Sequence, residues 1–175
     1  MTAWRLFRQY PVRILIGLAL LLLVMIAVRL DAAFRREQRI ADDIKECGGA
    51  VTLAPFLPKW VPEILRDRYR FVFFIQFKEQ APSGDMWSKM LSLRALTFLN
   101  LKDTSTSDDD LPQINGLTHL VVLNLCNTQV TDSGLVCLNR LSDLKVVNLK
   151  DTPTTPEGRV MLRKTLPNCK VEPDP

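Results

Sequence analysis

A motif of 24 residues recurs without gaps through the C-terminal half of this 175-residue chain. Its three clearest copies begin at Leu93, Leu117 and Leu141. Further columns match in residue type: Leu96, Leu120 and Leu144; Leu99, Leu123 and Val147; Leu101, Leu125 and Leu149; Thr104, Thr128 and Thr152. A fixed period of this length indicates stacked repeats, because one unit cannot bury its apolar side alone.

The period extends beyond these three copies. The same spacing reaches back to Ile75 and Phe77, and one period earlier to Val51 and Leu53. The sequence from Leu166 to Val171 holds one more apolar pair, which comes two residues short of the full period. A shortened last unit is typical of a terminal cap, because the last repeat has no neighbour to cover it.

Each copy predicts a short strand followed by a short helix. The alternating leucines place two apolar side chains on one face of a strand. Apolar pairs three residues apart then mark one face of a helical turn; they are Trp87 with Met90, Leu111 with Ile114, and Leu135 with Leu138. Hydroxyl residues align at the expected N-caps, which are Ser83, Ser107, Thr131 and Thr155. Asp108 and Asp132 follow two of these caps, where a carboxylate favours the positive end of a helix.

From Leu117 to Leu138 the chain reads L-x-x-L-x-x-L-x-L-x-x-T-x-V-T-D-x-G-L-x-x-L. This pattern resembles the leucine-rich repeat family, and in particular bacterial membrane-anchored proteins with T-D-x-G-L repeats. The resemblance is strong over residues 93–164 and weaker over 45–92. It departs from the family pattern where Asp110 stands in for Gly134 and where Arg159 replaces the helix leucine. It implies an α/β solenoid with short parallel strands and with helices on its convex side.

An apolar segment precedes the repeats. Fifteen consecutive uncharged residues run from Ile14 to Val28, and Val12 to Leu30 extends the span if Arg13 and Arg29 reach the lipid head groups. This is the length that a tilted helix needs to cross a bilayer. The sequence therefore predicts one transmembrane helix and a single-pass membrane protein.

A cleaved signal peptide is the alternative interpretation of this segment. Ala33 is a conceivable cleavage residue, but Asp31 stands where a small side chain is needed, which favours an uncleaved anchor. The side of the membrane on which the repeats lie stays open, because both flanks of the apolar segment are basic.

The charge of the chain is concentrated at its N-terminus. The formal net charge is +4 and the pI is near 9.0, which by itself invites a nucleic-acid interpretation. Residues 1–30 hold four arginines and no acidic residue, whereas residues 31–175 hold 19 basic and 19 acidic groups. The repeats are therefore neutral, and we expect no nucleic-acid partner.

Few residues are suited to catalysis or metal binding. His119 is the only histidine and aligns with Ala95 and Asp143, a variable surface position, so we expect no enzyme. The run Asp108 to Asp110 is explained by the helix dipole, so we expect no metal and no cofactor. The cysteines match no zinc spacing and are interpreted as free thiols, although a disulfide stays open; they are Cys47, Cys126, Cys137 and Cys169.

These patterns divide the chain into five segments. We expect a membrane anchor over 1–30, a juxtamembrane helix over 31–46, an N-terminal cap over 47–68, leucine-rich repeats over 69–164, and a C-terminal cap strand and tail over 165–175. Phe34, Ile40 and Ile44 are the apolar residues of the juxtamembrane helix. Pro62 opens a short helix in the N-terminal cap, and Trp60, Ile64 and Leu65 are expected to close the core there.

In the resembling fold, the residues that flank the strand leucines face the concave side. Cys126 is expected to be accessible there. The candidate partner-binding residues are Phe74, Gln76, Lys78, Phe98, Asn100, Lys102, Val122, Asn124, Cys126, Val146, Asn148 and Lys150. The alternative is that these are solvent-tolerant strand positions, repeated because the sequence was duplicated.

Two functions follow from these predictions. The first is a membrane-tethered, noncatalytic scaffold that binds a protein or peptide of unknown identity through its concave face. The second is a structural envelope protein that self-associates through its anchor and juxtamembrane helix.

Overall fold

The computed structural model describes residues 3–55, 59 and 70–173. The chain divides into two compact parts, Met1–Arg36 and Glu37–Pro175. The cap helix expected at Pro62, and the positions of Trp60, Ile64 and Leu65, lie outside the described residues.

Helix α1 spans Ala3–Glu46 without interruption, so the expected anchor and juxtamembrane helix are one element. Its stretch Ile16–Glu46 is long and apolar enough to cross a membrane, with a mean hydropathy of 2.3 over its apolar part. A helix of this kind near an N-terminus is also typical of a signal sequence. The boundary between the two compact parts lies within α1, after Arg36.

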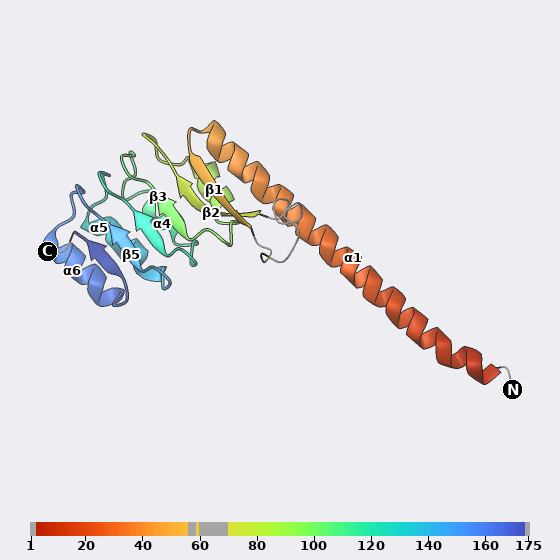
Figure 1. Cartoon of the computed structure of the whole chain (residues 1–175). Coiled ribbons are helices and arrows are strands. Elements are labelled where there is room, and N and C mark those ends of the chain that lie inside the picture. Colours follow the sequence, from red (N-terminus) through yellow and green to blue (C-terminus); the bar gives the residue numbers. More distant parts are fainter. Residues whose placement is uncertain (1–2, 56–58, 60–69, 174–175) are drawn as a thin grey trace. The chain divides into compact units, whose positions relative to one another are not determined.

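The second compact part contains a six-stranded sheet in the order β1 to β6 (Figure 1). From β2 to β6 all neighbours are parallel, and each strand is displaced from the next by one repeat period in the same register. The predicted mixed α/β architecture with a parallel sheet is confirmed. The strands are β1 Ala50–Pro55, β2 Arg70–Gln76, β3 Phe98–Asn100, β4 Val122–Asn124, β5 Val146–Asn148 and β6 Lys170–Glu172.

Both ends of the sheet differ from the sequence prediction. Val171 pairs with Val147, so the last strand keeps the full repeat period and the expected shortening by two residues is wrong. Strand β1 is antiparallel to β2, with Ala50 opposite Gln76, so the apolar spacing at its start does not mark another repeat. The tight turn after α1 passes through Gly48, whose φ is 78°, and sends the chain into β1 against the direction of β2.

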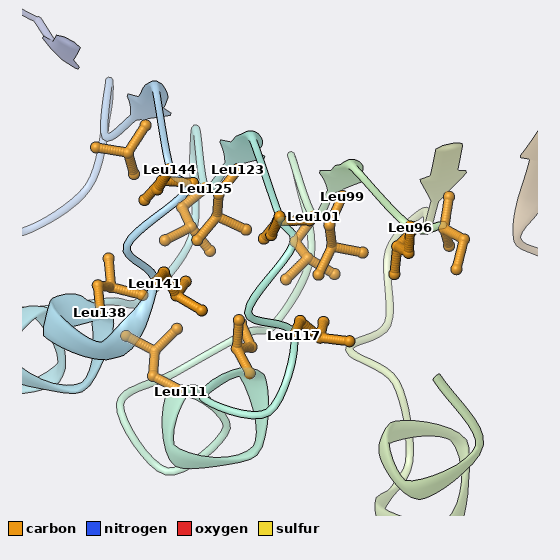
Figure 2. Packing of buried hydrophobic residues seen from close by; sticks show 14 of the residues in the cluster. Leu96, Leu99, Leu101, Leu111, Leu117, Leu123, Leu125, Leu138, Leu141 and Leu144 are labelled. Atoms are coloured by element: carbon orange, nitrogen blue, oxygen red, sulfur yellow. The ribbon is translucent and has the colours of Figure 1, made fainter. Parts of the chain in front are cut away.

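Short helices follow the parallel strands and cover one face of the sheet. The apolar pairs predicted to lie on one face of each helix are all buried, including Trp87 with Met90 and Leu135 with Leu138. Figure 2 shows the labelled leucines packed between strand segments and helical turns. The helices are α3 Gly84–Met90, α4 Leu111–Ile114, α5 Asp132–Leu135, the 3-10 helix η1 Val136–Arg140 and α6 Pro156–Thr165.

The last turns of α1 belong to the core of the second compact part. Ile40 and Ile44 are buried in the same cluster as Val72 and Ile75. Glu37 is buried as well, and its Oε2 accepts a hydrogen bond from the Val72 backbone N–H at 2.9 Å. The end of α1 therefore covers the first strands of the sheet.

Two arginines of α6 satisfy carbonyl groups at the other end. Arg163 Nη2 donates to Val171 O at 2.8 Å, on the edge strand β6. Arg159 Nη1 donates to Thr154 O at 2.9 Å. Arg159 thus stands at the position of the helix leucine and bonds this carbonyl group through its guanidinium.

Candidate functional site

The residues that flank the buried strand positions form an ordered surface on the other face of the sheet. We call this surface the open face. Phe74 and Phe98 lie side by side, with ring centroids 4.8 Å apart and ring planes tilted by 45°. All members are half-buried. The open face consists of Phe74, Gln76, Phe98, Asn100, Val122, Asn124, Val146 and Asn148, in two columns that the strand register aligns.

The asparagines of the open face also end their strands. Asn100 Oδ1 accepts from Lys102 N–H at 3.0 Å, and Asn124 Oδ1 accepts from Cys126 N–H at 3.0 Å. Asn148 Oδ1 accepts from the amide two residues later at 2.9 Å. These are Asx turns, which an asparagine makes by bonding the backbone two residues on. The repeated asparagines therefore have a structural role as well as an exposed position.

These turns fix the orientation of each side-chain amide. A backbone N–H only donates, so the oxygen of each amide must face it and the Nδ2 group points elsewhere. Among the described residues, no acceptor is hydrogen-bonded to Nδ2 of Asn100, Asn124 or Asn148. The middle of the open face thus presents free amide N–H groups, whereas one lone pair of each amide oxygen is already used.

The outer strands bound the open face. Thr52 lies opposite Phe74 on β1, and Lys170 lies opposite Val146 on β6. Glu172 lies opposite Asn148, and its Oε1 is 2.5 Å from Lys170 Nζ. This boundary differs from the sequence prediction, in which the last strand lies two residues out of register.

The predicted lysine column lies beyond the strand ends and is balanced by carboxylates. Lys78, Lys102 and Lys150 are exposed, and Lys102 Nζ lies 3.6 Å from Asp103 Oδ2. The next residue of each unit has a left-handed backbone, with φ of 65° at Glu79, 59° at Asp103, 53° at Asn127 and 56° at Asp151. Three lysines therefore face three carboxylates, and this border carries no net charge.

Cys126 is not accessible, contrary to the sequence prediction. Its exposed fraction is 6%, and its Sγ lies 4.0 Å from Asp151 Oδ2 of the next unit. The left-handed backbone at Asn127 turns the chain just after it. All four cysteines are free thiols in the structure, and burial raises the pKa of the Cys169 thiol. We exclude Cys126 from the partner-binding residues.

Two aspartates join consecutive repeat units. Asp108 Oδ1 accepts from Thr131 N–H at 2.8 Å, and its Oδ2 accepts from Thr131 Oγ1 at 2.6 Å. Asp132 binds Thr155 through the same two bonds, at 2.8 and 2.6 Å. We call these contacts the aspartate clamps. Asp108 lies before helix α4, which begins at Leu111, so the clamp and not the helix dipole accounts for it.

Glycine makes room for each clamp. A Cβ at Gly134 would lie 2.3 Å from Asp108 Oδ1, and one at Gly158 would lie 2.1 Å from Asp132 Oδ1. In the unit of residues 93–116, Asp110 stands at the position of this glycine. The unit before it carries Gly84 at the position of the clamp aspartate, so no clamp needs the space there. The departure at Asp110 from the family pattern thus has a steric reason.

Two of the four predicted N-caps, Thr131 and Thr155, are confirmed together with their side-chain hydrogen bonds. Thr131 Oγ1 accepts from the N–H of Ser133 at 3.2 Å, and Thr155 Oγ1 accepts from that of Gly158 at 3.1 Å. Ser83 is an N-cap without a side-chain hydrogen bond. Ser107 is not a cap, because α4 begins four residues later after Asp110. There Asp110 Oδ2 accepts from Ser107 N–H at 2.9 Å.

Other candidate groups gather no further chemistry. His119 Nδ1 lies 3.5 Å from Asp143 Oδ2, and both side chains are exposed. Within the described residues, no cluster of three or more His, Cys, Asp or Glu side chains is placed to hold a metal ion. A shallow groove of about 150 Å³ lies on the helical side, lined in part by Leu135, Val136 and Met161.

The comparisons with known proteins found a similar solved structure. It is a leucine-rich repeat protein of Leptospira interrogans, 24% identical in sequence, with a TM-score of 0.41. The likeness covers 54% of this chain and 22% of that protein, so the chain matches about a fifth of its length. No protein-family model and no curated protein matches the chain.

Proposed function

We propose that this chain is a membrane-tethered leucine-rich repeat solenoid that binds a protein or peptide through its open face and has no catalytic role. The observation that carries this proposal is the alignment of one apolar and one amide column across the four strands β2 to β5. Interfaces combine buried apolar contact with a small number of directed hydrogen bonds. The open face provides both.

The edges of the sheet offer less for a partner than its face. A sheet edge binds an extended partner through unpaired backbone groups. On β6, Arg163 already donates to Val171 O, and the strand has three residues. The other edge strand is β1, which has six residues, whereas the open face extends across the four strands β2 to β5. The face therefore remains the larger binding surface.

The membrane tether rests on α1. From Ile16 to Leu30 its side chains are apolar apart from Arg29, and nearly all are exposed. Exposed apolar surface of this extent favours a lipid environment, with residues 12–30 as the span. The arginines at both flanks suit anionic head groups.

The alternative function, self-association through the anchor and juxtamembrane helix, has less support. Ile40 and Ile44, which would mediate it in the juxtamembrane part, are buried in the core of the second compact part. They are therefore not available to a second copy of the chain.

Site-specific photocrosslinking in the host's own membranes tests the proposed function. Benzoylphenylalanine replaces Phe98 on the open face or, as the matched control, Val136, which is 67% exposed on the helical side. We expect a discrete protein adduct from position 98 and none from position 136. An adduct only at 136, or at neither position, would overturn the proposal.

A further inference from the structure

The asparagine row of the open face has more free hydrogen-bond donors than acceptors. The Asx turns use the oxygens of Asn100, Asn124 and Asn148 and leave their Nδ2 groups as donors. Each of these amides therefore offers two free N–H groups against one remaining lone pair, so donors outnumber acceptors along the row. A partner rich in acceptors and poor in donors matches this surplus.

We propose that the open face binds a proline-rich segment in the polyproline II conformation, lying across the strands. This proposal rests on the proposed function and names its partner. Proline has no N–H, and a polyproline II segment forms no internal hydrogen bonds, so its carbonyl groups are free to accept. The surplus of donors in the asparagine row is thus complementary to a ligand that only accepts.

The spacing of the donors fits this conformation. Parallel neighbours in a sheet lie about 4.8 Å apart, so the in-register Asn100 and Asn148 are separated by about 9.6 Å. A polyproline II helix rises about 9.3 Å in one turn of three residues. Carbonyls one turn apart therefore reach the first and third asparagines of the row, with Asn124 between them.

The apolar column next to the asparagines suits proline rings. Phe74 and Phe98 are tilted against each other with centroids 4.8 Å apart, and Val122 and Val146 continue the column. Proline-rich segments dock on grooves lined by aromatic side chains in other recognition domains. The apolar column contributes contact area and the amide row fixes the orientation.

The charges nearby favour a neutral ligand over an acidic one. Lys78, Lys102 and Lys150 are each followed directly by a carboxylate residue, so the border of the open face has no net charge. An acidic peptide would gain little there. Binding of the proline-rich segment is thus expected to be nearly independent of salt between about 0.1 and 0.5 M.

Fluorescence anisotropy with the full chain in detergent micelles tests this proposal. The probes are fluorescein-labelled decaproline, a Gly-Ser peptide of equal length and an Ala-Glu peptide of equal length. We expect saturable binding of decaproline and no binding of the other two. Preference for the acidic peptide, equal binding of all three, or no binding of decaproline would overturn the proposal.

Asparagine-to-aspartate variants test the amide donor without removing the oxygen that holds the turn. Asn124→Asp keeps an oxygen for the Cys126 N–H and so keeps the turn, but it removes the Nδ2 donor. Asn124→Asp with Asn148→Asp should weaken decaproline binding by about tenfold or more with little change in thermal unfolding. Asn139→Asp, on η1 at the helical side, is the matched control. Equal affinity of all variants would contradict the role of the donors.

The two proposals can fail separately. If decaproline does not bind but position 98 gives a protein adduct, the proline-rich partner is rejected and the proposed function is retained. If decaproline does not bind and position 98 gives no adduct, the open face is rejected as a binding surface.

Discussion

At the scale of single residues, the aspartate clamps explain why the repeat motif contains both an aspartate and a glycine. Asp108 bonds the backbone and the hydroxyl of Thr131, and Gly134 leaves the space that the carboxylate fills. A charged acceptor bonded to two donors contributes more than a neutral hydrogen bond. Each motif is therefore half of a contact that the next unit completes.

Gly134→Ala should destabilise the protein. The new Cβ would lie 2.3 Å from Asp108 Oδ1, so the clamp must shift, at a cost of about 1–3 kcal/mol in the free energy of unfolding. Denaturant unfolding followed by tryptophan fluorescence measures this change, since Trp87 is buried.

The matched control is Gly84→Ala in α3, where a Cβ meets open space. That change should be neutral or slightly stabilising, because alanine favours the helix. The pair of variants would contradict the steric role of Gly134 if both unfolded at the same denaturant concentration.

The residue patterns show what a sequence of this kind predicts. The repeat period and the alternation within each strand correctly place the buried leucines and the columns of the open face, because both depend on local spacing. The clamp between Asp108 and Thr131 joins separate units and has no local signature. The contact between Cys126 Sγ and Asp151 likewise joins one unit to the next.

At the scale of elements, the two ends of the sheet are built differently from its middle. The middle strands repeat one register, whereas β1 reverses direction after the turn at Gly48. The direction of β1 depends on that turn and on the packing of α1. The periodicity of the sequence carries no information about either. The end of α1 supplies Ile40, Ile44 and the Glu37 carboxylate to the first strands.

Glu37→Ala should weaken this end of the sheet. It removes the acceptor of the buried Val72 N–H, which costs about 1–3 kcal/mol in the free energy of unfolding. Glu37→Gln keeps an oxygen acceptor and should retain much of the stability. Thermal unfolding of the full chain in detergent measures both changes.

Glu46→Ala serves as the control, because Glu46 is exposed at the end of the same helix. Equal melting temperatures for Glu37→Ala and Glu46→Ala would show that the bond to Val72 N–H contributes nothing.

At the scale of the whole molecule, two compact parts share one helix. From Ile16 to Leu30, α1 is largely apolar and exposed. The last turns of the same helix pack in the core beside the sheet that carries the open face. All of the net positive charge lies in residues 1–30, and residues 31–175 hold equal numbers of basic and acidic groups. The proposed tether and the proposed binding surface therefore lie in separate regions of the chain.

The protein should remain with its host's membranes after washing with alkaline carbonate. Replacing Leu21 and Leu23 by Asp should release it, because a charged side chain at the bilayer centre costs about 2.5–3.5 kcal/mol. Intact mass spectrometry distinguishes the alternatives. Retention of the full 19.9 kDa supports the anchor, and a mature chain beginning after Ala33 would show a cleaved signal peptide.

The clamp positions also limit how such a protein can lengthen by duplication. Residues 117–140 carry both Gly134 to receive a clamp and Asp132 to make the next one, so a second copy inserted after the first fits at both junctions. A tandem copy of residues 93–116 would set Asp108 of the first against Asp110 of the second, two carboxylates in one place. The stack can therefore lengthen by duplication of residues 117–140 but not by duplication of residues 93–116.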